Sequence, residues 1–417
     1  MKTSRQMKKT SPKTADKHSM LRVGIVVPHI FMQESILPKV IFSPGQLAID
    51  LAEGLTSLGI DVTLFSPGPV KTKVKNVTAN LSNFKTELAA RGDSYIDLLK
   101  KHPLTFISLA RQVQSELIAM AYKMANDEKL DIVHIYTNEE DIALPFAQLC
   151  AKPVVFTHHD PFNFLVTYKN VFSKYSELNW ISISLAQRQG MPSNTNWIGN
   201  VYHGLDENLF QPNYYSKTKY LAYMGRIIEP KGLHLAIKAV QKYNANHKQQ
   251  FNLKIAGKHY AGYHKDVYWQ KYISPLLDNR RIEYVGFISD IAAKQSFLAN
   301  ATALLIPSIF SEPFGMVAIE ALACATPVIC LDSGALPEII SNQKNGFVIK
   351  KHYQKSKLDT DKIINDYVSA IELIESIDRK RCRTTFMKRF TAERMCLEYK
   401  LIYEKLAHPI TKLQVEP

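Results

Sequence analysis

Residues 303–331 decide how this chain folds, and they read ALLIPSIFSEPFGMVAIEALACATPVICL. Two uninterrupted apolar runs, at 303–306 and 328–331, have the length expected of strands buried on both faces of a parallel sheet. Residues 315–323 between them predict a helix. A strand, a helix and a second strand in this order form a parallel unit with a right-handed crossover.

The same alternation extends in both directions along the chain, and it predicts an α/β protein of two doubly wound, Rossmann-like parallel-sheet domains. Ligands of such sheets bind outside the carboxyl ends of the strands. The other predicted strands are 23–27, 62–65, 132–135, 154–157, 180–184, 220–224, 253–256 and 282–285. The other predicted helices are 46–58, around 143–150, 233–243 and 361–406.

The change between the two series of strands sets the domain boundaries. We place the first domain at 20–207 and the second at 208–385, with a hinge near 206–216. A C-terminal helix at 386–407 is predicted to cross back to the first domain. The basic tail at 1–19 is predicted to be disordered because its charges are alike. A ligand site is expected in the cleft between the domains.

The composition is that of a globular protein with an excess of positive charge. Apolar residues make up 46% of the chain, charged residues 22%, and the formal net charge is +14. This balance suits a polyanionic partner, such as a nucleotide diphosphate, a nucleic acid or an anionic membrane surface. The five cysteines form no CxxC pair, and we find neither a secretory signal nor an apolar run of bilayer length. We therefore expect a cytoplasmic protein.

Two glutamates in the opening stretch are the first candidate site residues. Glu320 is the only charge in residues 315–331, and a lone carboxylate in an apolar helix is costly to bury without a partner. Pro313 places Glu312 in the loop before the helix, next to backbone N–H groups that point outward toward an anion. This arrangement suits a nucleotide sugar. The alternative is a capped helix with one glutamate on a solvated face.

A second cluster, MGRIIEPKG at 224–232, turns from a strand into a helix. Arg226 supplies a planar fork of donors and Lys231 a compact positive charge. Two basic groups at a helix N-terminus predict a diphosphate clamp. The alternative is that both side chains are merely solvated.

In the first domain, the strand at 154–157 ends in His158, His159 and Asp160. Histidines at this end of a parallel strand face the cleft, where they can bind a ligand, act as a base or orient a hydroxyl. A histidine satisfied by a backbone carbonyl is the alternative. The loop that leads to Gly45 is long and apolar, which indicates a functional loop, and a glycine lets a ligand approach the backbone.

The sequence lacks the motifs of several other classes of protein. The chain has no GxGxxG after its first strand, no GxxxxGK[ST] and no GxSxG, and its basic residues are not interleaved with aromatic ones, so no nucleic acid is expected. The single Asp-x-Asp triplet, Asp359 to Asp361, precedes a predicted helix, where Asp and Thr are ordinary N-cap residues. We therefore predict no metal site and no cofactor.

Taken together, these residues resemble the retaining glycosyltransferases of family 4, the group 1 glycosyl transferases with the two-domain GT-B fold. The resemblance covers about 21–406 and is strongest over 220–348. The motifs that carry it are Gly225-Arg226, Pro230-Lys231-Gly232, Glu312-Pro313-Phe314-Gly315, Glu320, Ala325-Thr326-Pro327 and Asn345-Gly346-Phe347.

The resemblance implies a role for each matching residue of the donor site. Arg226 and Lys231 are similar to the pair that binds the diphosphate. Glu320 is similar to the carboxylate that holds the ribose, and Glu312 to the one that contacts the donor sugar. Backbone contacts to the donor are implied for Phe314, Gly315, Met316 and Val317.

In the first domain, His159 resembles the histidine that lies beside the reacting sugar, and Gly45 resembles the loop glycine that approaches the phosphates. The sequence departs from the family pattern at Pro44, where a glycine is usual, and this bears on the role of Gly45. Asp160 and Ala325 also replace common glycines, and we expect them to tune the acceptor site.

The implied activity is transfer of a sugar from a nucleotide diphosphate donor to a hydroxyl acceptor, without a metal. The acceptor would be a sugar, a lipid-linked molecule or a small molecule, and contact with an anionic membrane would place the protein at the inner membrane face. The alternatives are a catalytically silent GT-B module that binds a nucleotide or a partner, and an isomerase or phosphorylase of the same fold.

Overall fold

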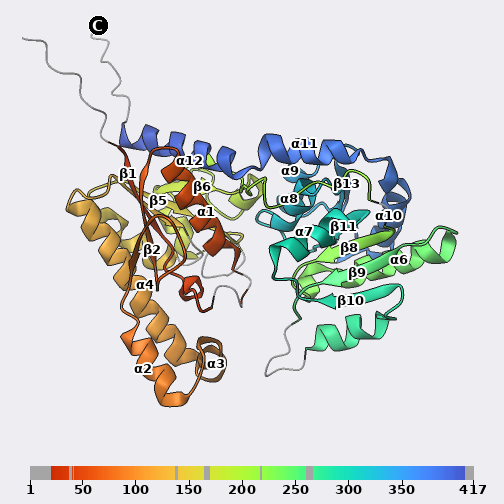
Figure 1. Cartoon of the computed structure of the whole chain (residues 1–417), viewed down its shortest axis with the longest axis horizontal. Coiled ribbons are helices and arrows are strands. Elements are labelled where there is room, and N and C mark those ends of the chain that lie inside the picture. The colour runs from red at the N-terminus through yellow and green to blue at the C-terminus, as the bar shows by residue number, and fades with distance from the viewer. Residues whose placement is uncertain are drawn as a thin grey trace, which may run out of the picture.

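The computed structural model describes residues 20–36, 40, 42–136, 140–163, 170–216, 218–259 and 266–408. The tail predicted at 1–19 lies outside these residues. Figure 1 shows two α/β bodies side by side, each built on a parallel sheet with helices packed around it. The predicted fold class is confirmed.

The first sheet has the strand order β3-β2-β1-β4-β5-β6-β7 within the described residues, and all its pairings are parallel. Its middle strands are buried at every residue and apolar at most of them, because helices cover both faces. The strands are β1 Arg22–Val26, β2 Asp61–Ser66, β3 Lys75–Thr78, β4 Ile132–Tyr136, β5 Val154–Thr157, β6 Asn179–Ser182 and β7 Trp197–Asn200.

The second sheet has the order β10-β9-β8-β11-β12-β13, again with parallel pairings only among the described strands. A short antiparallel hairpin, β14 Tyr353–Gln354 with β15 Lys357–Leu358, follows it. The strands of the sheet are β8 Tyr220–Met224, β9 Asn252–Ala256, β10 Ile282–Gly286, β11 Ala303–Ile306, β12 Val328–Leu331 and β13 Gly346–Ile349.

Helices cover both sheets, and several begin at side-chain caps. Asp290 accepts a hydrogen bond from the Ala293 N–H at the start of α7, and Asp359 does so from the Lys362 N–H at the start of α10. The helices are α1 Ser43–Ser57, α2 Ser82–Arg91, α3 Tyr95–Lys101, α4 Pro103–Asn126, α6 Leu233–Asn246, α7 Ile291–Ala299, α8 Met316–Ala323, α9 Leu336–Ile339, α10 Thr360–Leu373, α11 Arg379–Arg389 and α12 Ala392–Ala407.

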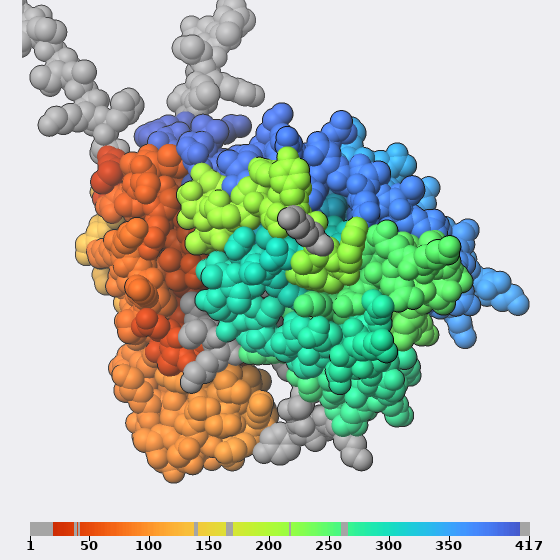
Figure 2. Space-filling view, turned by 45° about the vertical axis from the view of Figure 1, so that its right-hand side comes forward, coloured from red at the N-terminus to blue at the C-terminus, as the bar shows by residue number. Residues whose placement is uncertain are grey.

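The last helices join the two bodies. In Figure 1, α11 lies over the second sheet and α12 continues along the top onto the first body, where it packs against α1. The Tyr403 hydroxyl lies 2.6 Å from Nδ1 of the buried His134 on β4. Leu205 in the connection between the sheets exchanges backbone hydrogen bonds with Phe390 and Ala392. Figure 2 shows the yellow-green and blue segments bridging the bodies.

The structure corrects several predicted elements. The helix expected from residue 46 begins at Ser43, because proline fits the first helical positions. The helix expected around 143–150 is a 3₁₀ helix, Leu144–Leu149. The helix expected over 361–406 is three helices, α10 to α12, with breaks near 374–378 and 390–391. The strands β3, β7 and β13 were not predicted, and the residues of β3 and β7 are only partly buried.

Candidate active site

The loop between β11 and α8 carries Glu312, and an ion pair holds this residue in place. Lys231 Nζ lies 2.6 Å from Oε1 and 2.8 Å from Oε2 of Glu312, and the two side chains are only 17% and 10% exposed. Lys231 comes from the 3₁₀ turn Glu229–Lys231 that follows β8. The structure thus brings together two residues that the sequence singled out separately.

The two loops are also joined through their backbones. The N–H groups of Ile309 and Phe310 both donate to the Pro230 carbonyl, at 2.9 and 3.0 Å. Gly232 has φ +68°, and a Cβ atom there would lie 2.0 Å from the Pro307 carbonyl oxygen. Only glycine fits such a position, which explains the glycine of the Pro-Lys-Gly motif.

The start of α8 offers unused backbone donors. Gly315 is the N-cap, with φ +123°, and no side chain caps the helix. Among the hydrogen bonds of the described residues, none uses the N–H of Phe314, Gly315, Met316 or Val317 as its donor. Such N–H groups, together with the helix dipole, favour an anion at this point.

Glu320 is 8% exposed, so it does not lie on a solvated helix face. Its Oε1 accepts a hydrogen bond of 2.9 Å from Nζ of Lys294 on α7. Sequence reasoning required a partner for this carboxylate but did not find Lys294, which comes from a different helix. Lys294 gave only a weak signal in the sequence, because a lysine in a helix is ordinarily solvated.

Arg226, the other residue of the expected diphosphate clamp, is exposed at the end of β8. Its side chain makes no hydrogen bond to any described residue. Lys351 is a cation that the sequence did not indicate: its Nζ donates to the Ile309 carbonyl (3.0 Å) and to Ser333 Oγ (2.9 Å). Burial lowers the pKa of Lys351, and these two contacts hold the loop that carries Glu312.

His159 lies at the end of β5 and is 6% exposed. Its ring is stacked on that of His203, with centroids 5.2 Å apart and planes at 7°, and Tyr136 meets it edge-on at 4.5 Å. Phe314 of the second body contacts this group of rings, because its ring centroid lies 4.9 Å from that of His203. Sequence reasoning missed His203, since a histidine in a connecting segment carries no local signal.

Burial holds the histidines of this region neutral near pH 7. It lowers the pKa of His159 well below the ordinary value, with neighbouring histidines as a further cause, and lowers that of His203 to about 3. It also lowers the pKa of His158 to about 4. The His158 ring packs against Phe162 and Phe172, so His158 is a core residue, whereas the His159 ring stacks on that of His203.

Gly45 and Asp359, two further residues that the sequence singled out, both lie at the starts of helices. Gly45 was expected just before a helix, and the structure places it, buried, within the first turn of α1. Asp359 caps α10, as its position predicted. The described residues contain no group of three or more His, Cys, Asp or Glu placed to hold a metal ion. Within the same ranges, every helix is too short or too polar to cross a membrane.

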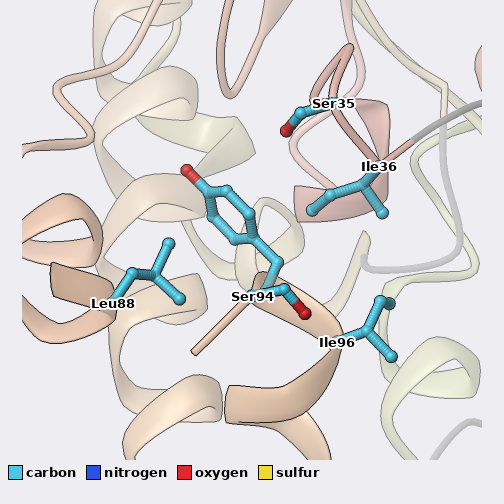
Figure 3. A pocket seen from close by; sticks show the side chains of 6 residues that line it. Ser35, Ile36, Leu88, Ser94 and Ile96 are labelled. Atoms are coloured by element: carbon cyan, nitrogen blue, oxygen red, sulfur yellow. The ribbon is translucent and has the colours of Figure 1, made fainter. Parts of the chain in front are cut away.

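A separate hollow lies in the first body, between the loop after β1 and the helices α2 and α3. Figure 3 shows Ile36 and Ile96 on one side of it and Leu88 on the other. Ser35, Ser94 and Tyr95 complete its lining. Its lining is therefore mainly apolar, with the hydroxyl groups of Ser35, Ser94 and Tyr95 among it.

Comparison with known proteins shows the family to which the chain belongs. The model of glycosyl transferases group 1 matches residues 205–380, and that of Glycosyltransferase Family 4 matches 45–195. The chain therefore belongs to the group 1, family 4-like glycosyltransferases of the GT-B fold. The Glu312 loop, Lys231 and Glu320 all lie within the first match, and His159 lies within the second.

Two relatives come from Methanocaldococcus jannaschii. The uncharacterized glycosyltransferase MJ1607 is 31% identical over 36% of this chain and 36% of its own length. The uncharacterized glycosyltransferase MJ1178 is 25% identical over 50% of this chain and 53% of its own length. The chain thus matches about a third to a half of the length of these relatives.

Solved structures share the fold. Sucrose-phosphate synthase from Thermosynechococcus elongatus has a TM-score of 0.67 at 18% identity, covering 93% of this chain and 99% of that one. Anabaena Alr3699/HepE in complex with UDP and glucose has a TM-score of 0.64 at 17% identity, covering 93% and 100%. At such identities the likeness shows the fold alone.

Proposed function

We propose that this chain is a retaining glycosyltransferase that uses a nucleotide-sugar donor. One observation carries the proposal: buried Glu312 is held by Lys231 beside unused N–H groups at the start of α8. A carboxylate binds sugar hydroxyls, and cations and backbone N–H groups bind phosphate. The arrangement therefore offers a site for each half of a nucleotide sugar. The complex of Anabaena HepE with UDP and glucose supports this choice of donor class.

The second body would bind the donor. In the proposal, Glu320 binds the ribose and the Phe314–Val317 backbone the phosphates. Arg226 and Lys231 stabilise the departing diphosphate, and this stabilisation makes catalysis mainly electrostatic. Because Lys231 is bound to Glu312 without a donor, we expect it to be shared between the carboxylate and a phosphate once the donor arrives.

The first body would bind the acceptor, and His159 would lie beside the reacting sugar. Near pH 7 its imidazole is neutral and can form a hydrogen bond with a sugar hydroxyl. The acceptor hydroxyl attacks the sugar carbon on the face from which the diphosphate departs and passes its proton to the departing phosphate oxygen, so the configuration is retained without a protein nucleophile. Gly45, in the first turn of α1, would approach the phosphates from this side.

The proposal includes no metal, because cations and the start of α8 supply the positive charge that a metal ion would bring. It places the protein in the cytoplasm, and contact of the basic chain with the anionic inner face of a membrane fits a lipid-linked acceptor. The apolar hollow of Figure 3 lies in the first body, to which the proposal assigns the acceptor.

A thermal-shift screen with UDP, GDP, ADP and dTDP tests the donor class. A nucleotide at 100 times its dissociation constant stabilises the protein by about 2.7 kcal/mol, which a melting curve resolves. Hydrolysis of the matching nucleotide sugar then separates an enzyme from a silent binding module. If no nucleotide raises the melting temperature, the proposed donor site is wrong.

A further inference from the structure

Four consecutive residues, 184–187, follow β6 and contact both halves of the candidate site; we call them the strap. Ser184 is fully buried, and its Oγ donates a hydrogen bond of 2.7 Å to the carbonyl of Pro313. Pro313 directly follows Glu312 in the loop before α8. A hydroxyl of the first body therefore holds the loop that carries a candidate catalytic carboxylate of the second.

The other end of the strap holds the backbone around His159. Gln187 is 2% exposed, and its Nε2 donates to the carbonyls of His158 (2.7 Å) and Asp160 (3.1 Å), one on each side of His159. The Gln187 N–H donates in turn to Ser184 Oγ at 3.0 Å. One connected set of hydrogen bonds thus runs from the His159 backbone to the Glu312 loop.

A carboxylate of the second body anchors the middle of the strap. Glu338 on α9 accepts hydrogen bonds from the N–H groups of Leu185 (2.9 Å) and Ala186 (2.6 Å). It also accepts one of 2.8 Å from the hydroxyl of Tyr202, in the connection between the bodies. Hydrogen bonds to an ionised carboxylate are the stronger kind, so the strap is held in one position.

We infer that Ser184 and Gln187 are positioning residues that set His159 and Glu312 in register across the two bodies, with Glu338 as their anchor. The chemistry of that register rests on the proposed function, whereas the connection itself does not. Neither side chain is assigned a contact with the donor. Ser184 acts through the backbone carbonyl of Pro313, next to Glu312, and Gln187 acts through the carbonyls on either side of His159.

The first test needs no substrate. Hydrogen exchange of the intact chain is compared for Ser184→Ala and for Ser57→Ala, a control that removes an exposed hydroxyl bonded only within its own helix. In Ser184→Ala we expect the peptide covering 309–320 to exchange about three- to tenfold faster, and in Ser57→Ala no change. Exchange unchanged in Ser184→Ala would overturn the inference, whether or not the protein is a transferase.

The second test separates positioning from general stability. Ser184→Ala and Glu338→Gln should each lower kcat for sugar transfer by about three- to tenfold, while the affinity for UDP, GDP, ADP or dTDP stays within about twofold. Because both changes act on one strap, the double variant should lose less than the product of the two factors. Equal losses of kcat and nucleotide affinity would contradict the inference, and so would independent effects.

Discussion

Replacing Lys231 by methionine tests whether the buried ion pair organises the donor loop. The variant keeps the length of the side chain and leaves Glu312, 10% exposed on its side chain, without its cation. Removing one partner of a buried pair costs about 3–5 kcal/mol, and the partial exposure of Lys231 favours the lower end. A loss of about 3 kcal/mol lowers the melting temperature of a domain of this size by roughly 6–12 °C.

Further variants measure the interaction energy between Lys231 and Glu312. Glu312→Gln leaves a lysine whose flexible stem can carry the ammonium group to water, so we expect a loss of about 1 kcal/mol. The double variant should be more stable than Lys231→Met alone, with a coupling energy of about 2 kcal/mol. Lys238→Met, on the exposed face of α6, makes the same change of charge and should alter stability by less than about 0.5 kcal/mol.

Urea and thermal unfolding of the wild type and the four variants supply the measurement. A Lys231→Met protein as stable as the wild type would refute the reasoning, because a buried carboxylate would then need no cation. Losses that simply add in the double variant would refute it as well, because they would show that the two groups do not interact.

The remaining predictions concern ligand, metal and pH. Glu320→Ala should weaken nucleotide binding at least tenfold, by about 1.4 kcal/mol, whereas Glu312→Ala should mainly slow transfer; equal losses of UDP or GDP affinity would contradict this division. Transfer should persist in excess EDTA and fall in Lys231→Ala, so activity abolished by EDTA and restored by Mg²⁺ or Mn²⁺ would count against the model. Burial raises the pKa of Asp50 to about 6, so the folded chain binds a proton at this carboxyl group more tightly than the unfolded chain does. The free energy of unfolding that this proton contributes is therefore lost as the pH rises from about 4 to 6. Asp50→Asn should therefore raise the free energy of unfolding by about 1–2 kcal/mol at pH 7 and have little effect at pH 4, and urea titrations at both pH values decide this.

Sequence patterns predicted the elements that are buried on both sides. The runs at 154–157, 220–224, 303–306 and 328–331 coincide with β5, β8, β11 and β12, because uninterrupted apolar strands are the clearest sign of a covered parallel sheet. The edge strands β3 and β7 were missed because their residues are only partly buried. The two breaks in the helical pattern at 361–406 were missed because no glycine or proline marks them.

The residues of the candidate site also fall into two groups, those that the sequence indicated and those that it did not. Glu312, Glu320, Lys231 and His159 stand in short motifs, so the sequence could single them out. Lys294, His203 and the strap could not be found, because their importance arises from contacts between residues that are far apart in the chain. Ser184 and Pro313, for example, are 129 positions apart. Local composition carries no record of such a contact.

The place of α12 has a consequence for how the protein is made. His134 is synthesised 269 residues before Tyr403, the residue whose hydroxyl contacts its ring. At roughly 5–20 residues per second, about ten to fifty seconds of translation separate them. During that time the face of the first sheet that α12 will cover stays open on the ribosome, so this domain is completed only after α12 has been made.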